Sequence, residues 1–234
     1  LNQPLSYLSA VSIIGISMTF GSIALCILLS YASMSDHDSY PRHTFLFELM
    51  VFLCCIAPMT DLITKALDNA GRPGLNLFVN TVYYLIGINV AYVIMLYEYL
   101  IIDADSKPVL KKVKRLASVL LLLGNLATLF NIFFGYFFTV TDGGKYQSAP
   151  TFWLAYIPPI LIIALTVITA AREMQPGRQK RAFLLFWLFA IGASFLQIWQ
   201  EELTVQYTGY TLTLIVLYMD VQGELDTICL KPLA

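Results

Sequence analysis

The stretch from residue 75 to residue 103 constrains this chain more than any other part of its sequence. It carries no formally charged residue between Leu75 and Tyr97. A helix needs about 20 consecutive apolar residues to cross the hydrocarbon core of a bilayer. Five basic residues follow in the connection 103–115, and such clusters favour the cytoplasmic side of a membrane. This one segment therefore predicts a membrane crossing and also the side on which the crossing ends.

The composition supports the same class of protein. Of the 234 residues, 58% are hydrophobic and 12% are charged, whereas soluble domains carry about 25% charged residues. The net charge of −1 gives no reason to expect nucleic acid as a partner. The chain begins at Leu1 with no basic segment before its first apolar run, so we interpret that run as a retained span and not as a signal peptide.

Seven apolar runs alternate with short polar connections. They predict an all-α membrane protein, a seven-transmembrane helix bundle in residues 1–221, with six or eight spans as the alternative. Residues 222–234 are expected to form a cytoplasmic exit, or linker, toward an output domain. Pro58 predicts a kink in the second span, and Pro158 and Pro159 fall in the middle of the fifth. The expected spans are residues 8–31, 45–64, 75–103, 116–138, 151–171, 182–200 and 207–221.

The basic residues predict the orientation of the bundle. If the N-terminus lies outside, the odd-numbered connections and the tail face the cytoplasm and hold eleven of the fourteen Lys and Arg residues. Short connections on the cytoplasmic side are enriched in these residues. We therefore expect a multi-pass protein of the plasma membrane with its C-terminus in the cytoplasm. The eleven are Arg42, Lys107, Lys111, Lys112, Lys114, Arg115, Arg172, Arg178, Lys180, Arg181 and Lys231, and the other three are Lys65, Arg72 and Lys145.

Polar side chains inside the spans are the candidates for a binding site, because a polar group at membrane depth is costly without a partner or a purpose. Helical spacing predicts that they form stripes and converge in the outer half of the bundle. There they would form a pocket for a small-molecule or lipid ligand. The alternative is that the amides form interhelical hydrogen bonds and the aromatic residues anchor the membrane interface. The candidate ligand-binding residues are Asn80, Tyr84, Asn131, Trp153, Gln197, Glu201 and Tyr207.

Two acidic residues, Glu48 and Glu98, are predicted near the cytoplasmic ends of their spans. We expect them to meet water at headgroup level or basic residues such as Arg115, with a proton relay as the alternative. The four cysteines lack metal-ligand spacing, and no phosphate-binding loop, zinc motif or nucleophile motif occurs. The sequence thus predicts no metal, no cofactor and no catalytic residue, and the last span lacks the lysine that a retinal protein needs.

Three short segments resemble the N-terminal seven-span sensor regions of bacterial signalling proteins that carry a diguanylate cyclase (GGDEF) or histidine kinase output domain. The second span runs through Asp61 into the glycine- and proline-rich turn 69–74, and the third begins Leu-Asn-Leu-Phe-Val-Asn-Thr-Val-Tyr-Tyr at residues 75–84. The last span runs into Asp-Val-Gln-Gly-Glu-Leu-Asp at residues 220–226. The chain departs from the cyclase pattern D-x-L-T-G-L-x-N-R, because Asp226 is followed by Thr-Ile-Cys-Leu.

This resemblance implies a receptor for signal transduction, not an enzyme, in a bacterial cell membrane. The ligand would bind in the outer half of the bundle, and a helix shift would pass to a cytoplasmic GGDEF or kinase domain of the full-length protein. Membrane lipids would surround the bundle, and a homodimer is the implied assembly. The second hypothesis is a transporter or channel subunit, which the amides inside the spans support. The odd number of spans and the lack of a detectable inverted repeat argue against it. A membrane enzyme acting on lipids or peptides is the third possibility.

Overall fold

The computed structural model describes residues 5–34, 41–68, 70–175, 177–199 and 208–219 as a bundle of long helices. Each of the seven predicted apolar runs has a helix in this part of the chain. The helices are α1 (Leu5–Met34), α2 (Pro41–Leu67), α3 (Pro73–Ile101), α4 (Pro108–Phe134), α5 (Ile157–Glu173), α6 (Arg178–Trp199) and a final unlabelled helix, Thr208–Met219. Smaller elements connect them: the 3-10 helices η1 (Ala104–Ser106) and η2 (Phe152–Tyr156), and the strands β1 (Phe138–Val140) and β2 (Tyr146–Ser148).

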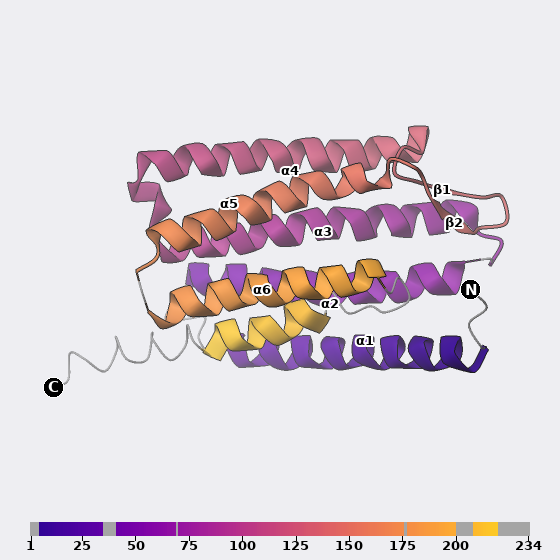
Figure 1. Cartoon of the computed structure of the whole chain (residues 1–234), viewed down its shortest axis with the longest axis horizontal. Helices are drawn as coiled ribbons and strands as arrows, with labels where there is room; N and C mark the ends of the chain where they lie inside the picture. Colours follow the sequence, from indigo (N-terminus) through magenta and orange to yellow (C-terminus); the bar gives the residue numbers. More distant parts are fainter. Residues whose placement is uncertain (1–4, 35–40, 69, 176, 200–207, 220–234) are drawn as a thin grey trace.

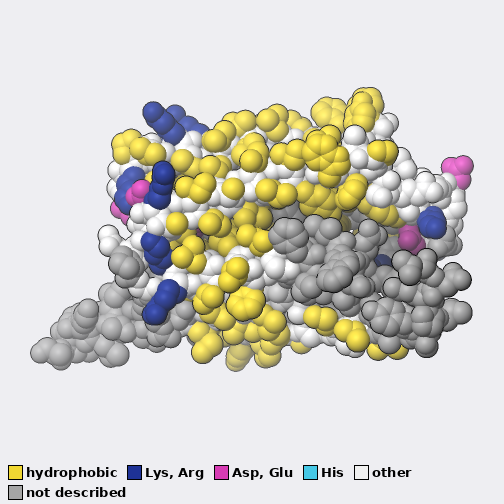
Figure 2. All heavy atoms as spheres, in the orientation of Figure 1, with side chains coloured by type: hydrophobic (Ala, Val, Ile, Leu, Met, Phe, Trp, Pro, Cys, Tyr) yellow, Lys and Arg dark blue, Asp and Glu magenta, His cyan; other side chains and the backbone are white. Residues whose placement is uncertain are grey.

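Five helical segments of the described chain are long and apolar enough to cross a membrane. Large apolar side chains such as Phe20, Leu122 and Phe133 point away from the bundle. A contiguous apolar surface of this kind requires an apolar solvent. Figure 2 shows hydrophobic side chains along the middle of the molecule, with Lys and Arg gathered toward one end. The chain is therefore an all-α, multi-pass membrane protein. The five segments are Ile13–Ser33, Arg42–Leu67, Pro73–Ile101, Pro108–Phe134 and Phe152–Glu173.

Helix α3 is the central helix of the bundle and packs against α2, α4 and α5. One side of it, including Val90, Ile94 and Tyr97, joins a core with α2, α6 and the Thr208–Met219 helix. Met95 and Tyr99 belong to a second core with α4 and α5. This burial on two sides explains why the sequence of α3 is apolar around most of its circumference.

Hydroxyl groups connect α1 to the Thr208–Met219 helix. The Ser22 hydroxyl donates to Thr208 Oγ1 at 2.9 Å, and the Tyr218 hydroxyl donates to the Ala32 carbonyl at 3.1 Å. Thr211 is fully buried, with its Oγ1 3.5 Å from the sulfur of Cys26. Thr211 and Tyr218 of the last span therefore pack against the first span, and hydrogen bonds between hydroxyls are a common means of helix association in membranes.

Pro158 and Pro159 lie inside the fifth candidate span, Phe152–Glu173, as predicted, but nearer its start than its middle, where the 3-10 helix η2 gives way to α5. Helix α5 begins at Ile157, which places Pro158 and Pro159 in its first turn, and η2 precedes them. Proline suits the first turn of a helix because its missing N–H group would have no intrahelical partner there. Pro58, in contrast, lies inside α2, which continues through it.

The fourth span ends earlier than expected, at Phe134 and not at residue 138. Gly135 adopts a left-handed conformation (φ 63°) and its N–H donates to the Asn131 carbonyl at 2.8 Å. This is the usual way in which a glycine ends a helix. The chain then turns into β1, so the predicted polar turn after the fourth span is a two-stranded antiparallel hairpin.

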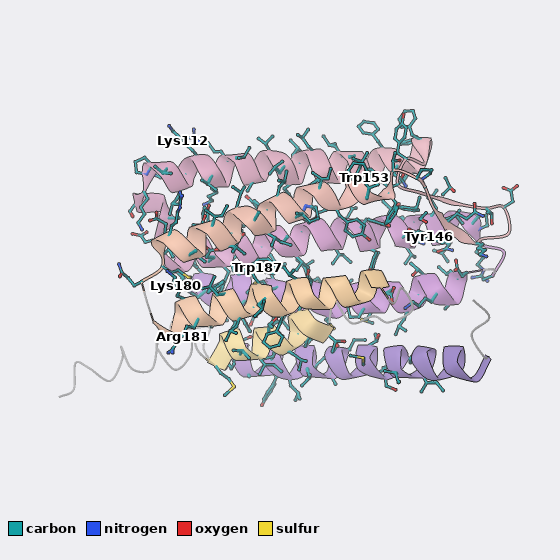
Figure 3. The ribbon with its side chains drawn as sticks, in the orientation of Figure 1. Lys112, Tyr146, Trp153, Lys180, Arg181 and Trp187 are labelled. Carbon is teal, nitrogen blue, oxygen red and sulfur yellow. The ribbon has the colours of Figure 1, made fainter. Side chains whose placement is uncertain are left out.

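The two ends of the bundle differ in charge and in structure (Figures 1 and 3). At one end, which we call the basic end, lie η1, the start of α4 and the α5–α6 connection, with Lys112, Lys180 and Arg181. Lys107 forms an ion pair with Glu173 at 2.8 Å, and the Lys180 ammonium donates to the Ala171 carbonyl at 2.6 Å. At the other end, which we call the hairpin end, β1 and β2 lie beside the start of α3.

Candidate functional site: the hairpin end and its apolar crevice

The β1–β2 hairpin is the most specific structure at its end of the bundle. Phe138 pairs with Ser148, Thr139 with Gln147 and Val140 with Tyr146. Gly144 closes the turn with φ 85°, and its N–H donates to the Thr141 carbonyl at 2.8 Å. A Cβ atom on Gly144 would stand 3.2 Å from the backbone nitrogen of Arg72. Two separate features thus require glycine at this position: the positive φ angle and the close approach of the α2–α3 turn.

Asn131 fastens the start of the hairpin to α4. Its Oδ1 accepts the backbone N–H of Phe137 at 2.6 Å and that of Phe138 at 3.4 Å. Its Nδ2 donates to the Phe138 carbonyl at 3.1 Å. Asn131 is 1% exposed, and a buried amide without partners would be costly. One side chain therefore satisfies three backbone groups at the point where the helix gives way to the strand.

A second set of hydrogen bonds fastens the tip of the hairpin to the α2–α3 turn. Asn76 Nδ2 donates to Asp68 Oδ1 at 3.1 Å and to the Gly144 carbonyl at 2.7 Å. The same Asp68 oxygen accepts the backbone N–H of Tyr146 at 2.9 Å. Asn80 Nδ2 donates to Asn76 Oδ1 at 2.7 Å. The hairpin is thus held from two different helix ends, by Asn131 on α4 and by Asn76 and Asp68 around the α2–α3 turn.

Aromatic rings fill the space between the hairpin and α3. Tyr84 is stacked on Phe138 with ring centroids 5.1 Å apart, and Phe138 is stacked on Tyr146 at 5.5 Å. The hydroxyls of Tyr84 and Tyr146 are 2.9 Å apart. Stacked rings with a shared hydroxyl contact combine apolar burial with orientation. The hairpin therefore packs as a cover on the first turns of α3.

Next to this cover, an apolar crevice of about 250 Å³ lies between α4, η2 and the start of α5. Gly124 forms part of its floor and contacts α5 so closely that a Cβ there would lie 2.9 Å from Pro158 Cβ. Leu123, Leu154 and Ile157 are partly exposed at its walls, so the crevice opens on the apolar outer surface of the bundle. Its lining residues are Leu120, Leu123, Gly124, Ala127, Phe137, Leu154, Ala155, Ile157 and Pro158.

The structure brings three of the seven predicted ligand-binding residues together, but around the hairpin and not around an open polar pocket. Asn80, Tyr84 and Asn131 each form hydrogen bonds within the chain. Trp153 is 55% exposed on η2 at the same end of the molecule. Gln197 belongs to α6, but its side chain lies outside the described residues, as do Glu201 and Tyr207. Ligand binding by these seven residues stays a prediction.

The crevice and the hairpin were not predicted from the sequence. The hairpin had a signal, since Asp142, Gly143 and Gly144 form a typical turn sequence between two β-prone segments, Phe138–Val140 and Tyr146–Ser148. The crevice had a weaker signal: Leu120, Leu123, Gly124 and Ala127 follow helical spacing on α4, with two small residues among them. Small residues on a membrane helix predict close packing and do not distinguish it from a crevice.

Glu98 differs from the expectation that it meets headgroup water or a basic residue such as Arg115. It is 0% exposed, and neither carboxylate oxygen has a hydrogen-bond partner in the described part of the chain. The two ion pairs seen there involve other residues, Lys65 with Asp61 and Lys107 with Glu173. Glu98 lies one turn before the end of α3, between Tyr97 of one core and Tyr99 of the other. A buried carboxyl without a partner is an uncommon feature that carries a cost in stability. Glu48 has a partner, because the Ser33 hydroxyl donates to its Oε1 at 3.4 Å.

Two pairs of polar side chains join α3 and α4 along their length. Asn89 Nδ2 on α3 donates to Asn125 Oδ1 on α4 at 3.2 Å, and the hydroxyls of Tyr92 and Ser118 join the same two helices at 2.7 Å. These contacts follow the alternative in which intramembrane amides serve helix association.

Comparison of the chain with protein-family models, with curated proteins and with solved structures finds no match. The interpretation of the hairpin end and of the crevice therefore rests on the geometry described above.

Proposed function

We propose that this chain is a membrane-embedded sensory module that binds a small ligand at the hairpin end and transmits a helix shift to a cytoplasmic signalling output. The observation that supports this most is the double role of Phe137. Its side chain lines the crevice, and its backbone N–H is held by Asn131 at 2.6 Å. A ligand in the crevice therefore touches the residue that begins the hairpin, and its binding would favour one arrangement of the hairpin over another.

The proposed topology has seven spans, the hairpin end outside a bacterial cell and the basic end in the cytoplasm. The clustering of Lys112, Lys180 and Arg181 at one end supports this orientation under the positive-inside rule. α6, with 22 residues, and the Thr208–Met219 helix would supply the sixth and seventh crossings.

The central position of α3 supports the proposed route of the signal. It begins at the hairpin contacts of Asn76 and ends beside η1 at the basic end. Because α3 packs against both cores, a small displacement at one end must be matched by its neighbours along the whole helix. The output domain, of the GGDEF or kinase class, would receive the displacement through the last helix of the bundle.

A change in the hairpin anchor tests the coupling between the two ends without any knowledge of the ligand. Spin labels on Lys112→Cys of α4 and Arg181→Cys of α6, in a background with the native cysteines replaced by alanine, report the distance between these helices at the basic end. Asn131→Leu removes three hydrogen bonds of the hairpin, and we expect a shifted or broadened distance distribution in lipid nanodiscs.

Gln147→Leu is the matched control, because Gln147 is exposed on β2 of the same hairpin. It should leave the distance distribution unchanged. Superimposable distributions for the parent protein and for Asn131→Leu would show that the two ends are not coupled, and the sensory proposal would then be abandoned.

A transporter or channel subunit remains the second candidate, and the buried Glu98 is the observation that favours it. An ionisable side chain at membrane depth often marks a path for ions or protons. Flux of protons or of a small solute in proteoliposomes that contain this chain alone, with loss of the flux in Glu98→Gln, would favour the transporter over the sensor.

A further inference from the structure

We propose that Glu98 of α3 is a proton-binding site whose carboxyl is protonated in the helix arrangement described above, and that loss of this proton rearranges the helices at the basic end. The proposal goes beyond the proposed function, because the proton acts at the basic end and needs neither the crevice nor the hairpin. It assigns the protein a second input, the pH at the basic end.

Burial decides the charge state of Glu98. The residue is 0% exposed, and in the described part of the chain neither carboxyl oxygen has a hydrogen-bond partner. Acidic side chains are almost never fully buried unless they are paired. An isolated ionised carboxylate is so costly to remove from water that such a group takes up a proton instead. The neutral, protonated carboxyl is therefore the form that fits this position.

Glu98 lies at the seam between the two cores that share α3. Tyr97 beside it belongs to the core with α2 and α6, and Tyr99 belongs to the core with α4 and α5. Its helical neighbours one turn away, at positions 94, 95, 101 and 102, are all Ile or Met. A charge created at Glu98 would therefore stand among apolar side chains of both cores, and it would act on the contact between them.

These surroundings favour a proton over a metal cation. Hard metal cations take several oxygen ligands, and the described residues contain no group of three or more His, Cys, Asp or Glu side chains that could hold a metal. The hydroxyls of Tyr99 and Thr169, which join α3 to α5 at this end, are 3.5 Å apart, and Thr169 donates to the Leu165 carbonyl at 2.7 Å. A proton needs no ligand besides the carboxyl itself.

The charged groups around this end of α3 have other partners or contacts. Lys107 pairs with Glu173 at 2.8 Å, and the Lys180 ammonium donates to the Ala171 carbonyl at 2.6 Å. None of the ion pairs or hydrogen bonds seen between described residues involves the Glu98 carboxyl. The charged or histidine side chains that are at least partly buried on the surrounding elements are His43 and Glu48 on α2, Lys107 before α4, Lys114 on α4, Glu173 on α5 and Lys180 on α6.

The direction of the pH dependence follows from the protonated form. The described arrangement binds one proton more than any arrangement in which Glu98 is ionised and hydrated. Lowering the pH therefore favours it, and raising the pH until Glu98 ionises disfavours it. The released proton passes to water at the basic end, because α3 ends three residues later at Ile101, about 4.5 Å along the axis at 1.5 Å per residue.

Ionisation changes the spacing of the helices on the two sides of the seam. A buried carboxylate must gain water or a cationic partner, and the side chains of both cores fill the space around Glu98. The cores must therefore separate to admit either one. Because α4 belongs to one core and α6 to the other, the distance between these two helices at the basic end reports the change.

Infrared difference spectroscopy tests the protonation state on the unaltered full chain in lipid nanodiscs. Ionised carboxylates lack the carbonyl stretch of a protonated carboxyl, and exposed Asp and Glu side chains are ionised at neutral pH. We expect this band at neutral pH, its loss at alkaline pH and its absence from Glu98→Gln. Glu173→Gln is the matched control and should retain the band, since Glu173 is a partly exposed carboxyl paired with Lys107 at the same end.

Spin labels on Lys112→Cys and Arg181→Cys test the rearrangement. In the parent protein the distance distribution should shift when the pH is raised until the infrared band disappears. Glu98→Gln, whose neutral amide has the shape of the protonated carboxyl, should keep the neutral-pH distribution of the parent at every pH. Glu173→Gln should retain the pH-dependent shift.

Three results would overturn the proposal. A neutral-pH spectrum without a band that Glu98→Gln removes would show that Glu98 is ionised. Loss of the band at alkaline pH with an unchanged label distance would show that the proton does not influence the helices. A band that appears only when choline replaces sodium would show that a metal cation occupies the site. All three are measured without Asn131→Leu, so they are independent of the test of the sensory proposal.

Discussion

The side-chain amide of Asn76 on α3 donates to Asp68 across the α2–α3 turn at 3.1 Å, and the same nitrogen donates to the Gly144 carbonyl of the hairpin at 2.7 Å. The first contact joins residues 8 positions apart, and the second joins residues 68 positions apart. They make the hairpin a part of the helical bundle and not a free loop. The Asn76 amide should therefore contribute to the stability of this end of the molecule, together with Asn131.

Asn76→Leu should destabilise the protein, because it removes both contacts and leaves the buried amide of Asn80 without the Asn76 side-chain oxygen that it binds at 2.7 Å. Unsatisfied buried groups cost about 1–3 kcal/mol each. Thermal unfolding in detergent should show a clearly lower midpoint. Gln147→Leu, an exposed change on the hairpin, should have the midpoint of the wild-type protein, and equal midpoints for both variants would refute the role given to Asn76.

Gly124→Ala should also destabilise the bundle, since the added Cβ would lie 2.9 Å from Pro158 Cβ and 3.3 Å from Ile88 Cδ1. Overpacking of this kind costs about 1–3 kcal/mol. Gly21→Ala is the matched control, because a Cβ at that position of α1 meets nothing within 4 Å. In Gly21→Ala the gain in helix propensity, at most about 1 kcal/mol in aqueous helices, should leave stability unchanged or improved. A lower unfolding midpoint for Gly21→Ala than for Gly124→Ala would contradict the packing described for α4 and α5.

Gly144→Ala should loosen the hairpin, whereas Gly143→Ala should not. Gly144 has φ 85°, and a Cβ added to it would lie 3.2 Å from the backbone nitrogen of Arg72. At Gly143 the nearest atom is 3.9 Å from the added Cβ. Strain at a left-handed position costs about 1–3 kcal/mol. Limited proteolysis of the hairpin should be faster in Gly144→Ala, and identical cleavage rates in the two variants would show that the turn conformation is different.

Glu98→Leu should leave the stability of the protein unchanged or raise it. In the described part of the chain the carboxyl is fully buried without a partner, and replacing a buried polar group by an apolar one of similar size is often neutral or stabilising. Glu98→Lys should be strongly destabilising, because it buries a longer cationic side chain in the same place. Unfolding midpoints in detergent distinguish the two substitutions. A large loss of stability in Glu98→Leu would reveal a partner for Glu98 and would place this residue in a functional network.

The helices could be predicted from the sequence because their apolar runs are long and uninterrupted. Residues 75–103 identified α3 to within two residues at each end, since charged residues and proline bound the run. α4 was predicted less well at both ends. Pro108 begins the helix well before the apolar run, because the lysines that follow it are good helix formers. Gly135 ends it early by adopting a left-handed conformation that the apolar run does not reveal.

The candidate site could be predicted only in part, for a physical reason. Burial of Asn80 and Asn131 follows from their positions in apolar runs, and both are buried. Their hydrogen-bond partners cannot be predicted from those positions. Asn131 binds backbone groups of the hairpin, and Asn80 binds Asn76, which itself holds the hairpin. The crevice was missed because it forms where η2 and the first turn of α5, which contains Pro158, meet α4.

In the proposed orientation the hairpin end faces outside the cell and the basic end faces the cytoplasm. Single cysteines at Gln147 of the hairpin and at Lys112 of α4, both exposed positions, test it in intact cells with a membrane-impermeant maleimide. We expect Gln147→Cys to be labelled in intact cells and Lys112→Cys to be labelled only after the membrane is permeabilised. Labelling of Lys112→Cys in intact cells, with Gln147→Cys protected until permeabilisation, would contradict it.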